Sequence, residues 1–187
     1  MVNHGISTGA LFLCVGILYE RSHSRMIADY GGVSAKMPVF SAFFLIAILS
    51  SMGLPGLNGF VGEILCFFGI FAAGKTLAFL AILTVILSAA YLLGLFRKVM
   101  QGPVVQERVS SFKDLDGREL SYIIPLIILM FGLGLAPGPV LRKMDASVKA
   151  HMLLIRGRSG GSPEAGLPAG VAVPGRSDPF RGKDQAR

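Results

Sequence analysis

The sequence predicts an all-α fold: a fragment of a polytopic transmembrane helical bundle with one discontinuous helix and a disordered C-terminal tail. The 187 residues are 52% hydrophobic and only 16% charged, against roughly 25% charged in an ordinary soluble domain. The mean hydropathy of +0.63 combines an apolar part, 1–141, with a polar, basic part, 142–187. Asp, Glu, Lys and Arg are all absent from long stretches of the apolar part: 1–19, 37–62, 64–74, 76–96 and 120–141.

The first predicted helix covers 4–19 and ends in the polar string of residues 19–25. About 20 apolar residues are needed to cross the hydrocarbon core. Because this helix is shorter and starts at the chain end, we expect an incomplete span or one whose beginning has been lost, with Met1 an internal methionine.

The second predicted span covers 37–74 and is broken at 54–59, where Pro55, Gly56 and Gly59 form a hinge that cannot continue a regular helix. Each piece has about 15 residues, or roughly 23 Å, so neither crosses comfortably alone. We therefore interpret the two pieces as one discontinuous span with its break at membrane depth. Such a break is tolerated only where protein or a water-filled cavity covers the freed backbone groups.

Two more spans are predicted at 76–96 and 120–136. With helices alternating in direction, the connections 20–36 and 97–119 share one side of the membrane. Together they carry 8 basic residues, which the positive-inside rule places in the cytoplasm. The tail partly opposes this orientation, because it adds basic residues close to the last helix on the other side.

The tail, 142–187, is expected to be disordered, since 156–187 contains 7 Gly and 4 Pro in 32 residues. It also holds 9 of the 18 basic residues, so the net charge of +7 does not form the basic face, interleaved with aromatics, of a nucleic-acid-binding protein. Cys14 and Cys66 lie inside apolar runs without metal-ligand spacing, and we interpret them as small hydrophobic residues. We expect no metal site, no phosphate loop and no nucleophilic site.

Glu63 is the main candidate functional residue, because it is the only acidic residue between Asp29 and Glu107 and follows the break among apolar neighbours. An intramembrane carboxylate is costly and usually lines an ion or proton path. His4 is the second candidate, since histidine both accepts and donates a proton near neutral pH. The alternatives are that Glu63 caps the resumed helix at an interface and that His4 is an interfacial residue.

Four hydroxyl or amide side chains could support such a path. Ser7 follows His4 on the first helix, and the others flank the break, where they either bind water or satisfy backbone groups: Ser50, Ser51 and Asn58. A proton path also needs a balancing Lys or Arg, and 37–74 contains none. The chain by itself therefore does not complete the path.

Two sequence strings, NHGISTGALFLCVGILYERSHSR at 3–25 and GLPGLNGFVGE at 53–63, resemble one family. They are similar to the proton-translocating, antiporter-like membrane subunit M of NADH:quinone oxidoreductase, respiratory complex I, called chain 4 in mitochondria. The resemblance covers roughly 1–141; the sequence after Met144 does not share it.

The resemblance implies about fourteen transmembrane helices, of which this chain matches the last four. It also implies that His4 and Glu63 belong to a hydrophilic axis of proton-conducting residues. A Lys and a Glu on earlier helices complete that axis, so the isolated fragment is expected to be inactive. The enzyme activity is that of the complex, with no redox centre in this chain.

The family also implies cofactors and partners. NADH, FMN, iron–sulfur clusters and quinone are expected in partner subunits, and none in this chain. The expected partners are the lipid bilayer and other membrane subunits of complex I, including antiporter-like neighbours. The expected location is the bacterial inner membrane, in preference to the mitochondrial inner membrane.

Two alternatives remain open. The first is a subunit of a related Na⁺/H⁺ antiporter or membrane-bound hydrogenase, which shares the broken helix and its ionisable residue. The second is a non-catalytic, truncated membrane remnant. A reading frame that continues upstream into further apolar spans with a Lys and a Glu would favour the enzyme subunit.

Overall fold

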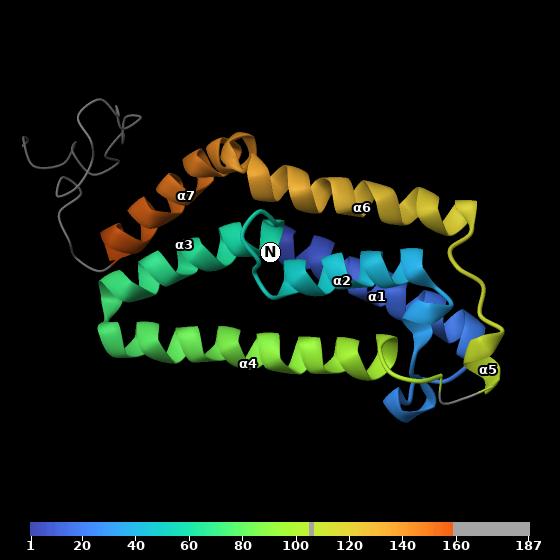
Figure 1. Ribbon diagram of the computed structural model, residues 1–187. Coiled ribbons are helices and arrows are strands. Elements are labelled where there is room, and N and C mark those ends of the chain that lie inside the picture. Colours follow the sequence, from blue (N-terminus) through green and yellow to red (C-terminus); the bar gives the residue numbers. More distant parts are fainter. Residues whose placement is uncertain (105–106, 159–187) are drawn as a thin grey trace, which may run out of the picture. The chain divides into compact units, whose positions relative to one another are not determined.

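The computed structural model describes residues 1–104 and 107–158, and the regular structure of that part is entirely helical (Figure 1). The all-α prediction is confirmed. The chain divides into two compact units, Met1–Leu141 and Arg142–Arg187. The helices are α1 (Val2–Ser22), α2 (Pro38–Ser51), α3 (Asn58–Ala73), α4 (Lys75–Met100), α5 (Glu107–Ser110), α6 (Gly117–Leu135) and α7 (Gly138–Arg158), with short 3₁₀ turns at Ile27–Asp29 and Val33–Ala35.

Three helices of the described chain are long and apolar enough to cross a membrane, namely α1, α4 and α6. The apolar helices α2 and α3 are shorter, and they follow one another across an interruption (Figure 1). Proline occupies the start of α2, where its missing N–H costs no helical hydrogen bond. The predicted class, a bundle of apolar helices with one discontinuous member, describes the first unit.

The interruption covers 52–57 rather than the predicted 54–59. Gly53 and Gly56 have φ angles of +74° and +95°, in the left-handed region that glycine adopts without steric cost. Gly59 lies inside the first turn of α3, so its assignment to the hinge is corrected. A Cβ at Gly59 would lie 1.9 Å from the backbone oxygen of Ser50, which means that glycine is needed there for the close approach of α3 to α2.

The helix ends also differ from the sequence-based bounds. α4 continues past Phe96 to Met100, because Val99 and Met100 are buried in the core although Arg97 and Lys98 precede them. Helix α6 starts earlier than predicted, at Gly117, where Asp116 and Glu119 form a reciprocal capping box. Hydropathy alone predicts that a helix ends where charged residues begin. In the structure, packing and capping extend these helices beyond that point.

The connections 20–36 and 97–119 lie at the same end of the first unit, as expected (Figure 1). The Ser34 hydroxyl donates to the backbone oxygen of Met100 at 2.6 Å. The carboxylate of Asp114 accepts from the first free backbone N–H groups of α2, those of Val39 at 2.9 Å and Phe40 at 3.1 Å. Each connection is thereby bonded to a helix that it does not itself join: 20–36 to the end of α4, and 97–119 to the start of α2.

A buried ion pair joins α1 to α6 at the same end. Arg21 and Glu119 lie 2.7 Å apart at their nearest atoms, with side chains only 14% and 4% exposed. Arg21 donates to both carboxylate oxygens and to the backbone oxygens of Ile17, Lys113 and Asp114. Sequence analysis did not single out this pair, whose partners are 98 residues apart.

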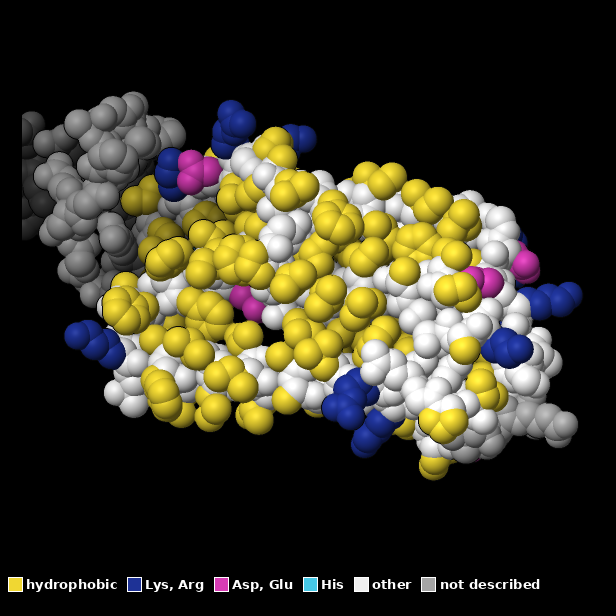
Figure 2. Space-filling model, viewed as in Figure 1, with side chains coloured by type: hydrophobic (Ala, Val, Ile, Leu, Met, Phe, Trp, Pro, Cys, Tyr) yellow, Lys and Arg dark blue, Asp and Glu magenta, His cyan; other side chains and the backbone are white. Residues whose placement is uncertain are grey.

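The hydrophobic core of the first unit lies mainly at this end, where Phe40, Phe44 and Phe96 form an aromatic cluster. Toward the opposite end, large apolar side chains of α3 and α4 are exposed, among them Phe68, Phe79 and Ile86. Figure 2 shows hydrophobic side chains along α3, α4 and α6, with Lys and Arg at the helix ends of this unit. Such a surface fits contact with lipid or with other protein, because a large apolar patch is unfavourable in water.

Helix α7 corrects part of the predicted disorder. Residues 142–158 are helical, and Lys149 pairs with Asp145 one turn earlier at 2.6 Å. The reason is local: 140–156 contains neither Gly nor Pro, whereas the composition that predicted disorder came from 156–187. The rest of the predicted tail, 159–187, lies outside the described residues.

Candidate functional site

The break between α2 and α3 is held by a buried polar cluster. Ser50 and Asn58 are both 0% exposed, and the Ser50 hydroxyl donates to the Asn58 side-chain oxygen at 2.5 Å. The Asn58 amide donates to the backbone oxygen of Asn3 at 3.0 Å, and the Asn3 amide donates to the backbone oxygen of Asn58 at 2.8 Å. Buried polar groups are costly unless paired, so this exchange fixes the start of α3 against the start of α1.

The backbone of the break is covered by α6. A Cβ added to Gly134 would lie 2.3 Å from the backbone oxygen of Gly56 and 2.6 Å from the backbone carbon of Leu57. Only glycine allows this approach. Gly56, one of the predicted hinge residues, therefore lies where a neighbouring helix contacts the interrupted backbone.

Glu63 lies in the second turn of α3 and is half-buried. Its carboxylate lies against Gly53 in the break, since a Cβ at Gly53 would be 2.1 Å from Oε2. Any side chain at position 53 would displace the carboxylate. Neither salt bridge in the described part of the chain involves Glu63.

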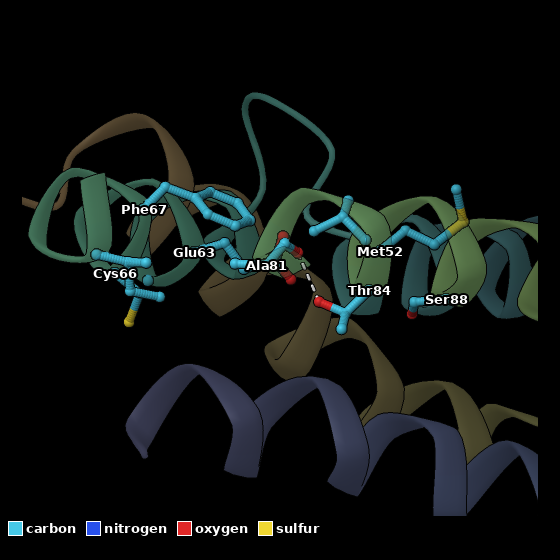
Figure 3. Close-up of a pocket in the computed structure, with 10 residues that line it drawn as sticks. Met52, Glu63, Cys66, Phe67, Ala81, Thr84 and Ser88 are labelled. Atoms are coloured by element: carbon cyan, nitrogen blue, oxygen red, sulfur yellow. Dashed lines mark hydrogen bonds between the residues drawn. The ribbon is translucent and has the colours of Figure 1, made fainter. Parts of the chain in front are cut away.

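The side chain of Glu63 lines a cavity of about 410 Å³ between α3 and α4 (Figure 3). Figure 2 shows the hollow between these two helices on the surface of the unit. The polar groups of its wall are Glu63, Thr84 and Ser88, and Thr84 donates to the backbone oxygen of Ala81 at 2.6 Å. The other lining residues are Met52, Gly62, Cys66, Phe67, Ile70, Ala81 and Val85.

The structure does not bring His4 and Glu63 into direct contact. His4 is exposed in the first turn of α1, and its ring bonds to the Thr8 hydroxyl at 3.3 Å. Its neighbour Asn3 is the residue that reaches α3. Sequence analysis missed Asn3 because a lone amide at a chain end carries no pattern; its partner, Asn58, lies 55 residues away.

The predicted supporting residues fall into two groups. Ser7, Ser50 and Asn58 all have hydrogen-bond partners, the Ser7 hydroxyl donating to the backbone oxygen of Asn3 at 3.1 Å. By contrast, the hydroxyl oxygen of Ser51 is buried and has no partner among the described residues. An orphan hydroxyl at an interrupted helix is a place where a water molecule would be bound.

The candidate site is built around the Glu63 carboxylate. Within 1–104 and 107–158 no three His, Cys, Asp or Glu side chains lie close enough to hold a metal ion. What the described residues provide is one carboxylate inside an apolar helix, next to an interrupted backbone and beside a partly polar cavity.

Comparison with known proteins gives consistent results. Residues 1–89 match the family model described as NADH:quinone oxidoreductase/Mrp antiporter, TM. The chain is 45% identical to NADH-quinone oxidoreductase subunit M of Rickettsia conorii over 149 residues, which are 80% of this chain and 30% of that protein. That match is longer than the 141 residues expected from the sequence strings, so similarity to the family extends into the sequence of α7.

Two solved structures share the fold. Respiratory complex I from Thermus thermophilus with bound NADH contains a chain with 39% identity and a TM-score of 0.68, covering 73% of this chain and 28% of that one. An archaeal membrane-bound sulfane sulfur reductase complex matches with a TM-score of 0.71 over 96% of this chain and 34% of its own chain; at 23% identity this likeness concerns the fold alone.

This chain thus spans about 30% of the length of the relatives that it matches. Its sequence agrees with those relatives, and its fold agrees with the matching chain of the Thermus thermophilus complex. The chain has helices that are long and apolar enough to cross a membrane, and it is similar to the membrane subunits described as NADH:quinone oxidoreductase/Mrp antiporter, subunit M among them.

Proposed function

We propose that this chain takes part in proton translocation, as part of a membrane subunit of NADH:quinone oxidoreductase, coupled to electron transport from NADH to quinone. The observation that carries the proposal is the position of Glu63. It is a carboxylate within an apolar helix, without a salt bridge in the described structure, beside a break and facing a cavity. A carboxylate in such surroundings usually belongs to an ion or proton path, because an ionisable group is costly in an apolar helix.

His4 is proposed as the relay next to Glu63. The His4 ring is hydrogen-bonded to Thr8 and exposed, so it is accessible to groups outside the described helices. Support comes from the contact between α1 and α3, because Asn3, the residue before His4, bonds to Asn58, five residues before Glu63. Ser50 and Asn58 hold the break in shape, and Ser51 would bind a water molecule.

The proposed surroundings follow from the family. NADH, FMN, iron–sulfur clusters and quinone belong to partner subunits, and the exposed apolar faces of α3 and α4 meet lipid or neighbouring membrane subunits. The proposed location is the bacterial inner membrane. The end carrying the connections 20–36 and 97–119 would face the cytoplasm, because those connections hold 8 basic residues.

The test is Glu63→Gln in the assembled complex that contains this chain. We expect NADH-driven proton uptake into sealed inverted vesicles to fall at least about a hundredfold, the low end of what general acid–base groups contribute, while the amount of assembled complex is unchanged. Asp145→Asn is the matched control, since it removes the charge of an exposed carboxylate. Normal uptake by Glu63→Gln would refute the role, and Na⁺-dependent uptake would favour an antiporter subunit.

A further inference from the structure

Helix α4 carries two hydroxyl side chains in the middle of its apolar length. Between Thr76 and Tyr91, Thr84 and Ser88 are the only hydroxyl residues. They are four residues apart and therefore lie on the same face of the helix. Both line the cavity that also contains Glu63 (Figure 3).

The two hydroxyls have unused hydrogen-bonding capacity. The Thr84 hydroxyl donates its hydrogen to the backbone oxygen of Ala81, so its oxygen remains free to accept. The Ser88 hydroxyl has no hydrogen bond within the described structure and is partly accessible. In hydrocarbon such groups are unfavourable unless something binds them.

The cavity is large enough to hold water molecules, which would be hydrogen-bond partners for the two hydroxyls. A volume of about 410 Å³ holds on the order of ten water molecules at roughly 30 Å³ each. A water molecule needs two to four polar partners to stay in place, and three side chains here provide them: Glu63, Thr84 and Ser88. A lipid chain in the same space would leave the carboxylate and the hydroxyls without partners, so water is the occupant that the chemistry favours.

We propose that Thr84 and Ser88 are positioning residues of the proton path: they hold a chain of water molecules against α4 that carries protons to and from Glu63. This inference rests on the proposed function. The Glu63 carboxyl releases a proton to the nearest water, and each water in the chain accepts one proton and passes another on. The hydroxyls exchange hydrogen bonds without ionising, so charge and protons balance at every step.

Cys66 provides a direct probe of hydration, because it lines the same cavity and is exposed. Cys14 is the internal control, since it is buried in the helix core and 2% exposed. In the assembled membrane complex, with other cysteines replaced, a cationic methanethiosulfonate reagent reacts only with a hydrated, ionised thiol. We expect Cys66 to react at least about tenfold faster than Cys14, and equal inertness of the two thiols would overturn the proposal.

The second test removes the hydroxyls and keeps the shape, with Thr84→Val and Ser88→Ala. Each is expected to slow proton uptake about fivefold, the factor that one net hydrogen bond contributes to a barrier. Thr84→Ser should restore the rate, and Thr76→Val is the control that removes a hydroxyl of α4 outside the cavity. Proton uptake at the wild-type rate by the double variant, Thr84→Val with Ser88→Ala, would overturn the proposal.

The readouts separate this inference from the proposed function. If Glu63→Gln loses uptake while the double variant keeps it, the water chain is wrong and the role of Glu63 stands. If Glu63→Gln keeps uptake, the proposed function itself fails. A double variant that does not assemble leaves the single Ser88→Ala variant and the Cys66 labelling rate to decide, because neither needs both substitutions.

Discussion

The ion pair between Arg21 and Glu119 should make a large contribution to the stability of the helix bundle. The pair is almost fully buried, and Arg21 uses its planar fork to contact both carboxylate oxygens and three backbone oxygens. Arg21→Met leaves a carboxylate that is 4% exposed without its partner. Breaking a buried pair in this way costs about 3–5 kcal/mol. Because Glu119 keeps its bond from the Asp116 backbone N–H, we expect the low end, about 3 kcal/mol.

The assay is denaturant titration of the purified protein in detergent micelles, followed by helical ellipticity. Lys149→Met is the matched control, because the Lys149–Asp145 pair is 57% exposed on both sides and should contribute only about 0.3–0.5 kcal/mol. Arg21→Lys keeps the charge but loses the fork, so an intermediate loss is expected. The double variant Arg21→Met with Glu119→Leu should be more stable than Arg21→Met alone, since no unpaired charge remains. If Arg21→Met lowers the free energy of unfolding no more than the Lys149→Met control does, the conclusion that burial makes this ion pair important for stability is refuted.

Two further predictions concern the break. Gly134→Ala should lower the melting temperature of the protein in detergent, because its Cβ would overlap the backbone of Gly56, and overpacking costs about 1–3 kcal/mol. Gly132→Ala, whose Cβ meets nothing within 4 Å, should leave the melting temperature unchanged or slightly raised; equal effects of the two would contradict the close approach. Asn58→Leu removes the buried bonds to Ser50 and Asn3 and should destabilise by about 1–3 kcal/mol in the same denaturant titration; a value near zero would mean that water replaces those bonds.

The sequence alone determined the features that depend on local chemistry. Stretches without charge predicted the apolar helices, and the Pro-Gly string predicted that the second span is interrupted, because both properties follow from a few adjacent residues. The isolation of Glu63 among apolar neighbours is equally local. Composition misled only where it averaged over unlike segments, as in the tail, whose first part forms α7.

The tertiary structure decided which distant residues meet. Asn3 rather than His4 contacts α3, and Gly134 covers the break, because the relative placement of whole helices sets these contacts. The cavity beside Glu63 exists only because α4 packs along α3, with Thr84 and Ser88 on the side that lines it. Hydropathy and spacing describe one helix at a time, whereas a site between helices depends on how their faces pack, and that information is not contained in any single segment.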